Sequence, residues 1–426
     1  MDDLSTVPEL FLELDNLRAA ARWARAAKNG MLLGRLATTP RNWLYNIFRV
    51  NEEWLGWLTS ARSIGIPDKG LEANVLKAIG DVQQFRDERE AALDSYAQAL
   101  TLFRTVGARL GEANVLKALG LESVSQQDFD QGLKYYQQSQ QLYEQIGDRY
   151  SQSVNLAQTA IAQWQLEQKT AAVDSFARAA RLADAIGVEA LRQYMLERLA
   201  EMSKEQSEWS VLTTLVQELV TLHPDDPGLR YAHANALYEQ KEYDQALAEF
   251  RRLVELAPDD PTAWNGLANT LESLDLNPEA IDAYSHSIEL TPDQAYLYRN
   301  RANIELESSR LDEAERDISK AVELQPDHPY THARQGYLAL ARGRFEEAET
   351  HLAFASENDD TAGWKLGLAL ARLGTGNADG ARQLAAEAMT RADKDDRASA
   401  IKWLERMVKL NPDLQSEVLQ DMLSSP

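Results

Sequence analysis

Two histidines four residues apart form the pair in this chain whose spacing best suits metal binding. On one helix face, His328 and His332 would present two imidazole nitrogens to one ion. Pro329 lies between them, however, and proline is favoured at the first helical position. We therefore expect the helix to begin there and to leave His328 in the preceding loop. The sequence implies no third ligand, so we interpret both as ordinary loop and groove histidines.

The sequence motifs of common catalytic sites are absent. The chain contains neither the phosphate-binding pattern G-x(4)-G-K-[ST] nor G-x-S-x-G nor H-E-x-x-H. Paired carboxylates are frequent, but such pairs on solvated helix faces are typical of a wet protein surface. We expect a protein that is not an enzyme and that uses no metal and no cofactor.

Composition limits the classes of partner. The 426 residues carry a formal net charge of −23 and include no cysteine, which excludes disulfides and thiolate metal sites. No apolar run approaches the ~18–20 residues of a membrane helix, and the N-terminus MDDLSTVPEL is acidic where a signal peptide would be basic. We predict a soluble, cytoplasmic protein that binds neither nucleic acid nor membranes. The charge favours a basic protein or peptide surface as partner.

Internal repeats organise the first half of the chain. The heptapeptide EANVLKA occurs at residues 72–78 and again, forty positions later, at 112–118. Gly107, Gly147 and Gly187 keep the same spacing, and each follows an apolar run at helical period. A glycine in that place is typical of a helix C-cap. Each of these long units is therefore predicted to be a pair of helices, the first beginning near EANVLKA.

The second half repeats with a shorter period of thirty-four positions. Small and turn-forming residues recur in fixed columns, which comprise Pro224, Pro258, Pro292 and Pro326, then Pro227, Pro261 and Pro329, and then Ala246, Ala280, Ala314 and Ala348. The prolines of the second column suit a first helical turn, and Asp226 and Asp260 before two of them suit N-caps. The alanines allow two helices to approach closely. The pattern again predicts helix pairs.

The shorter period, with this content, resembles the tetratricopeptide repeat. The segment AWNGLANTLESLDLNPEAIDAYSHSIELTPD has Trp264, Leu267, Ala268, Ala280, Tyr284 and Pro292 in the family's columns. The long units resemble the longer variant of the same repeat, so the resemblance covers residues 70–360. It implies an all-α fold, an α-solenoid of stacked antiparallel helix pairs that forms a right-handed superhelix, with the first helix of each pair on the inner wall.

The repeat pattern divides the chain into five predicted segments. These are a divergent, Trp-rich helical cap (1–69), three long repeats (70–187), a transitional helix pair where a bend would fall (188–222), four short repeats (223–360), and a degenerate repeat with a C-terminal helical cap (361–426). Because Trp23, Trp43, Trp54 and Trp57 all lie in the first segment, we expect them to have a distinct packing role there.

If the first helices line the inner wall, a few columns would face a ligand. Asparagine can read an extended peptide backbone, and tyrosine adds a rigid apolar surface with a polar tip. The alternative is that asparagine only links neighbouring helices. The predicted peptide-binding residues are Tyr231, Asn235, Asn265, Asn269, Tyr296, Arg299, Asn300, Asn303, Tyr330, Arg334 and Tyr337, joined more weakly by Asn74, Lys77, Asn114 and Lys117.

Co-chaperones of the family hold a partner's C-terminal carboxylate with two asparagines, two lysines and an arginine. The resemblance places Asn269, Asn300 and Arg334 in the asparagine and arginine positions, but Asn265 and Tyr330 stand where the lysines should be. Arg299 is a neighbouring cation that could compensate. The missing lysines remove much of the charge-assisted bonding, so a groove that reads the peptide backbone is favoured over a full clamp.

The N-terminal helix resembles another group of proteins. The residues of DNLRAA and RWA, from Asp15 to Ala24, are similar to the stretch that opens the repeat sensor of bacterial signal-transducing NTPases of the NB-ARC and AfsR type. Three hypotheses follow: a non-catalytic protein-interaction scaffold, which is favoured; a ligand-sensing regulatory module of such an NTPase switch, either as a stand-alone relative or as a fragment; and a co-chaperone-like adaptor with a partial clamp.

Overall fold

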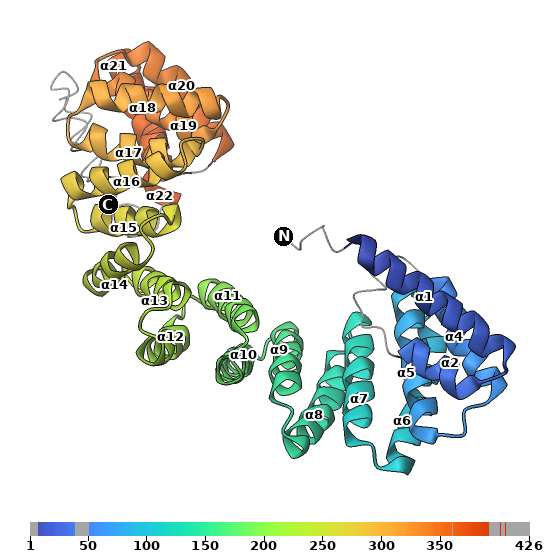
Figure 1. The fold of residues 1–426 in the computed structure, drawn as a ribbon. Coiled ribbons are helices and arrows are strands. Elements are labelled where there is room, and N and C mark those ends of the chain that lie inside the picture. Colours follow the sequence, from blue (N-terminus) through green and yellow to red (C-terminus); the bar gives the residue numbers. More distant parts are fainter. Residues whose placement is uncertain (1–6, 39–50, 360, 392–400, 402–404, 406–426) are drawn as a thin grey trace. The chain divides into compact units, whose positions relative to one another are not determined.

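The computed structural model describes residues 7–38, 51–359, 361–391, 401 and 405. Across these residues it contains 21 α-helices and no strand (Figure 1), which confirms the predicted all-α fold. The chain divides into two compact units, Met1–Leu215 and Val216–Pro426. The boundary falls within residues 188–222. No described helix is long and apolar enough to cross a membrane.

Unit 1 consists of consecutive antiparallel helices. They are α1 (Val7–Ala26), α2 (Gly30–Thr38), α4 (Asn51–Ile64), α5 (Lys69–Phe85), α6 (Arg89–Val106), α7 (Arg109–Ser125), α8 (Phe129–Ile146), α9 (Arg149–Gln165), α10 (Lys169–Ala185), α11 (Glu189–Gln206) and α12 (Ser210–Leu222), which contains the boundary. From α5 to α10 each odd-numbered helix packs against the next helix, so the long units are helix pairs as predicted.

Unit 2 continues with shorter helices. They are α13 (Pro227–Glu239), α14 (Tyr243–Leu256), α15 (Pro261–Ser273), α16 (Asn277–Leu290), α17 (Ala295–Glu307), α18 (Leu311–Leu324), α19 (Pro329–Ala341), α20 (Phe345–Asn358), α21 (Ala362–Gly374) and α22 (Ala378–Arg391). The four pairs of the short period extend from α13 to α20. The pair α21 and α22 occupies the first part of the predicted degenerate repeat, whereas the predicted C-terminal cap lies almost wholly outside the described residues.

The turns inside the helix pairs repeat with the same two periods as the sequence. One residue per pair adopts a positive φ, at Asp87, Gln127, Glu167 and Ser207 with the long period and then at Lys241, Asp275, Ser309 and Gly343 with the short one. In the turns that follow the helix pairs of the long repeats, Gly107, Gly147 and Gly187 have φ of 69°, 78° and 70°. This is the left-handed conformation that glycine adopts without strain, so the predicted role of these glycines in ending helices is confirmed.

Helix starts and close contacts in unit 2 also follow the sequence. The carboxylate of Asp226 accepts a hydrogen bond from the backbone N–H of Leu229 (3.1 Å), and that of Asp260 from Thr262 (2.9 Å). Both are the predicted N-caps. The alanines of the third repeated column, Ala246, Ala280, Ala314 and Ala348, are all 0% exposed. These small side chains lie where second helices pack against their neighbours.

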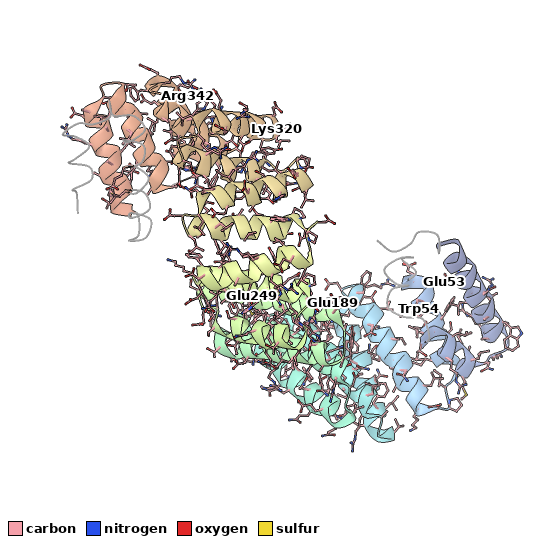
Figure 2. All side chains as sticks on the ribbon, turned by 60° about the vertical axis from the view of Figure 1, so that its left-hand side comes forward. Glu53, Trp54, Glu189, Glu249, Lys320 and Arg342 are labelled. Carbon is pink, nitrogen blue, oxygen red and sulfur yellow. The ribbon has the colours of Figure 1, made fainter. Side chains whose placement is uncertain are left out.

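The N-terminal tryptophans behave differently from one another. Trp54 and Trp57 of α4 are buried, and their rings stack with centroids 5.8 Å apart (Trp54 is labelled in Figure 2). Trp23 of α1 is 63% exposed, so the expected packing role is wrong for this residue. Trp43 lies outside the described residues. An ion pair between Arg18 of α1 and Glu53 of α4 (2.9 Å) links these two helices.

Candidate protein-binding face

The first helices of the pairs in unit 2 form one continuous surface. Among these helices α13 contacts α15 and α17 contacts α19, and a hydrogen bond from Asn303 of α17 to Glu272 joins α17 to α15. We call the outward side of α13, α15, α17 and α19 the first-helix face. These four helices carry every site residue predicted in this half of the chain, at positions that recur from one pair to the next.

Three of the predicted asparagines take part in a hydrogen-bond network within the protein. The Tyr284 hydroxyl lies within hydrogen-bond distance of Asn269 Oδ1, and it lies 3.1 Å from Glu272 Oε2. The side chain of Asn300 also forms a hydrogen bond with this hydroxyl. Asn303 Nδ2 donates to Glu272 Oε1 (3.1 Å). These contacts connect α15, α16 and α17. The alternative role of asparagine, linking neighbouring helices, therefore applies to these three residues.

Glu272 is the centre of this network, and the sequence-based prediction did not include it. Burial raises the pKa of its carboxyl, whereas the hydrogen bonds from Asn303 and Tyr284 and the charge of Arg334 act in the opposite direction. Glu272 lies three residues after Asn269 on the same helix. Residues at that spacing share a helix face, so this spacing is the signal that could have identified it.

Two predicted binding residues are buried rather than exposed on the face. Arg299 is 8% exposed, and its Nη1 donates to Gln325 Oε1 (2.8 Å) beyond α18. Tyr337 is 3% exposed and packs in the hydrophobic core of α17 to α22. Room for its ring comes from Gly367, where an added Cβ would lie 2.9 Å from the ring. The prediction that these two side chains line an accessible groove needs correction, because each packs toward a neighbouring helix.

The remaining predicted residues stay on the surface. Tyr296 and Tyr330 are 39% and 45% exposed. Tyr231 is half-buried and packs edge-on against Phe250. Burial raises the pKa of the Tyr296 phenol, and the nearby Tyr231 hydroxyl raises it further. Tyr330 contacts the ring of Trp364 on α21 at 4.7 Å. The exposed rings thus come from α13, α17 and α19.

Polar groups with few or no partners in the described part of the chain accompany these rings. Asn265 Oδ1 is buried and has no hydrogen-bond partner within the described part of the chain. Asn235 is half-buried and likewise makes no hydrogen bond to a described residue. Arg334 forms no ion pair with any described carboxylate. Its Nε lies 3.4 Å from the Arg299 carbonyl, and its guanidinium lies 5.8 Å from the centre of the Tyr337 ring.

The start of α19 separates the histidine pair His328 and His332. His328 is the N-cap of α19, with Nδ1 accepting from the Tyr330 N–H (3.3 Å), as expected from Pro329. His332 instead faces His351 of α20, with 2.9 Å between the two Nδ1 atoms. No group of three or more metal-ligating side chains occurs in the described residues.

The four site residues predicted in unit 1 have mixed surroundings. Asn74 is exposed, and its Nδ2 donates to the Gly70 carbonyl of its own helix (3.1 Å). Lys77 forms an ion pair with Asp81 (2.6 Å), and Asn114 Oδ1 accepts from the Tyr143 hydroxyl (2.7 Å). Lys117 makes no ion pair and no hydrogen bond with any described residue.

Comparison with known proteins identifies the repeats. The family model of the tetratricopeptide repeat matches residues 231–295, 299–353 and 333–397. No curated protein matches the chain. Similar solved structures include a thermophilic tetratricopeptide-repeat protein of Thermus thermophilus (25% identity, 42% of this chain and 99% of that one, TM-score 0.37). Another is YrrB, a tetratricopeptide-repeat protein with an unusual peptide-binding site (18%, 48% and 96%, 0.34). A third is the APC/C hetero-tetramer Cut9-Hcn1 (14%, 97% and 93%, 0.43).

The family match coincides with the structure. The matched residues begin within α13 and extend beyond α22, and they include the Asp260 cap and the buried alanine column described above. The described part of the chain is therefore all-α, and its residues 231–397 contain tetratricopeptide repeats.

Proposed function

We propose that the first-helix face binds an extended segment of a partner protein and that the protein is a non-catalytic interaction scaffold. The binding residues in this proposal are Tyr231, Asn235, Asn265, Tyr296, Tyr330 and Arg334. Asn269, Asn300 and Asn303 act indirectly, because their amides hold the surface rigid through Tyr284 and Glu272.

The observation that supports this proposal most strongly is the buried amide oxygen of Asn265. A buried polar atom without a partner costs ~1–3 kcal/mol, and the chain offers this one no partner among the described residues. A backbone N–H of a bound peptide would satisfy it once the Asn265 side chain changes rotamer toward the surface. The neighbouring rings of Tyr231, Tyr296 and Tyr330 would cover the peptide side chains, as aromatic anchors do in protein interfaces.

The net charge of −23 supports a basic partner through long-range attraction. Such attraction speeds association and weakens as salt is added. A basic partner should therefore associate faster at low ionic strength, with a smaller effect on dissociation.

The test is a peptide library selected on the wild-type protein. The affinities of the selected peptides are then measured by fluorescence anisotropy for the wild type and for Asn265→Ala and Tyr330→Ala. Removing the Asn265 amide or the Tyr330 ring should weaken binding by about tenfold each, the effect of a loss of ~1–2 kcal/mol. The matched control is Lys320→Ala on the second helix α18 (Figure 2), 43% exposed, which should bind as the wild type does.

The same peptides distinguish the backbone-reading face from the carboxylate clamp. Two of the clamp's cations are replaced by Asn265 and Tyr330, and Arg299 is turned inward. Peptides with a free and an amidated C-terminus should therefore bind equally well. Strong preference for the free terminus would favour the co-chaperone-like adaptor instead. Selected peptides that bind Asn265→Ala and Tyr330→Ala as tightly as the wild type would contradict the proposal.

The NTPase-sensor hypothesis has one observation in its favour. Trp23, within the NTPase-like motif, exposes 63% of its surface on α1, and exposed tryptophan is enriched at interfaces. An NTPase module encoded with this chain or beside it should then bind the wild type and lose affinity for Trp23→Ala. Equal binding by both would remove this support.

A further inference from the structure

The two copies of EANVLKA are followed by different residues. In the first copy Asp81 lies four residues after Lys77, whereas in the second copy Leu121 lies four residues after Lys117. A tyrosine of the following helix, Tyr96 or Tyr136, keeps the same offset as the two heptapeptides. The carboxylate of the first copy thus corresponds to an apolar side chain in the second, while the lysine and the tyrosine are retained.

In the first copy Asp81 joins two polar groups. Its Oδ2 accepts from Lys77 Nζ (2.6 Å), and its Oδ1 accepts from the Tyr96 hydroxyl (3.0 Å). Gln84 Oε1 lies 3.1 Å from the same hydroxyl. The cation on α5 and the phenol on α6 are therefore both satisfied within the protein.

The second copy keeps the same geometry without these acceptors. A Cβ added at Gly80 would lie 2.6 Å from Tyr96 Cε1, and one added at Gly120 would lie 2.5 Å from Tyr136 Cε1. The two rings are thus seated alike, but Leu121 and Val124 stand where Asp81 and Gln84 would provide oxygens.

Both polar groups of the second copy lack partners. Tyr136 is 0% exposed, and its hydroxyl is buried with no hydrogen bond to any described residue. Lys117 has no ion pair within the described ranges. Burial is the largest cause that lowers the pKa of Lys117, and the charge of Lys77 follows. The charges of Asp148 and Asp81 act in the opposite direction. A buried hydroxyl and a half-buried cation are therefore both available to an anion.

The third long repeat, which lacks the heptapeptide, supports this interpretation. The positions of Lys117, Leu121 and Tyr136 are taken by Ala157, Ile161 and Phe176, so the cation and the hydroxyl are both absent. The first copy has all three polar groups and the third has none. Only the second has a lysine and a tyrosine without the carboxylate that would join them.

We propose that a ligand carboxylate binds between Lys117 Nζ and the Tyr136 hydroxyl, in the position that Asp81 occupies in the first copy. This site belongs to unit 1 and does not depend on the first-helix face. Because the Tyr136 hydroxyl is buried, the carboxylate reaches it when Leu121, 36% exposed, changes rotamer. The carboxylate can be an acidic side chain or a chain terminus, since both have the same two oxygens.

The test follows the Lys117 side chain by NMR in protein labelled with ¹³C at lysine Cε, with the signal assigned through Lys117→Arg. The probes are acetyl-glutamate N-methylamide for a side-chain carboxylate, N-acetylglycine for a terminal one, and the neutral acetyl-glutamine N-methylamide. We expect a saturable shift of the Lys117 signal with one or both carboxylates and none with the amide. Tyr136→Phe should bind about tenfold more weakly, because it loses a hydrogen bond to a charged group.

Leu121→Asp provides the decisive comparison, because it supplies the missing carboxylate from the chain itself. The saturable response should disappear in this variant and persist in the matched control Leu110→Asp, on the same helix and 48% exposed. The converse change Asp81→Leu should make Lys77 respond as Lys117 does. The proposal is overturned if Lys117 responds to neither carboxylate, responds equally to the amide, or responds in Leu121→Asp as in the wild type.

Discussion

Glu305 of α17 is a buried carboxyl whose replacement should stabilise the protein. Its side chain is 4% exposed, and Oε2 has no hydrogen-bond partner within the described residues. Burial, reinforced by the charge of Asp317, raises the pKa of Glu305 to about 7. Arg301 offsets this only in part, because its guanidinium makes two hydrogen bonds to Asp317, both 2.7 Å.

The magnitude follows from proton linkage. Between the ordinary pKa of 4.5 and about 7 the folded protein holds a proton on Glu305 that the unfolded chain releases. The free energy of unfolding therefore falls as pH rises through this window and is constant above it. At ~1.4 kcal/mol per pKa unit, the loss is up to about 3 kcal/mol. Glu305→Gln does not titrate, so it should match the wild type near pH 4.5 and exceed its stability by up to about 3 kcal/mol above pH 7.

The assay is amide hydrogen exchange of α17 at several pH values, because repeat arrays unfold region by region. Glu279→Gln on α16, an exposed carboxyl, is the matched control and should leave the pH dependence of the wild type unchanged. A stability difference between Glu305→Gln and the wild type that stays constant from pH 5 to pH 8 would refute the reasoning.

Three further predictions concern tyrosines, a glycine and histidines. Tyr96→Phe should cost about 1–2 kcal/mol because it breaks a satisfied network, whereas Tyr136→Phe should be neutral or stabilising, as urea unfolding would show; equal costs would contradict the contrast. Gly120→Ala should cost about 1–3 kcal/mol in the same assay, because the new Cβ would lie 2.5 Å from the Tyr136 ring, and an unchanged stability would be inconsistent with this packing. Burial, the larger cause for both, lowers the pKa of His332 and of His351 below 6.5, so the stability of the α19–α20 pair should fall as pH drops below that value, and His351→Gln should lessen the fall. Hydrogen exchange of α19 and α20 between pH 7.5 and 5 measures this loss of stability. If stability falls with pH equally steeply in the wild type and in His351→Gln, the histidine pair is not its cause.

Much of the fold could be predicted from the sequence because the repeated residues have local roles. The left-handed conformation at Gly107 and the caps at Asp226 and Asp260 depend on a few neighbouring residues, and periodicity reveals them. The exposure of Trp23 was not predicted. Whether a tryptophan on an amphipathic helix is buried depends on which neighbouring helix covers it, and composition does not reveal that neighbour.

The site was predicted less completely, because its side chains extend into adjacent repeats. Arg299 occupies a face position, but Gln325 and Thr331 draw its guanidinium inward. Tyr337 is accommodated by Gly367 on the next pair. The amides of Asn269 and Asn303 are engaged by Tyr284 and Glu272 on other turns or helices. Periodicity places a residue on a helix face, but it does not show which distant partner its side chain will reach.

The most direct measurement is site-specific photocrosslinking of a library-selected peptide. A photoreactive amino acid replaces Tyr296 on the first-helix face or, in a second protein, Lys320 on α18. We predict a crosslinked product from position 296 that unlabelled peptide suppresses, and none from position 320. Crosslinking from position 320 with none from position 296 would contradict the claim that the first-helix face binds the partner segment.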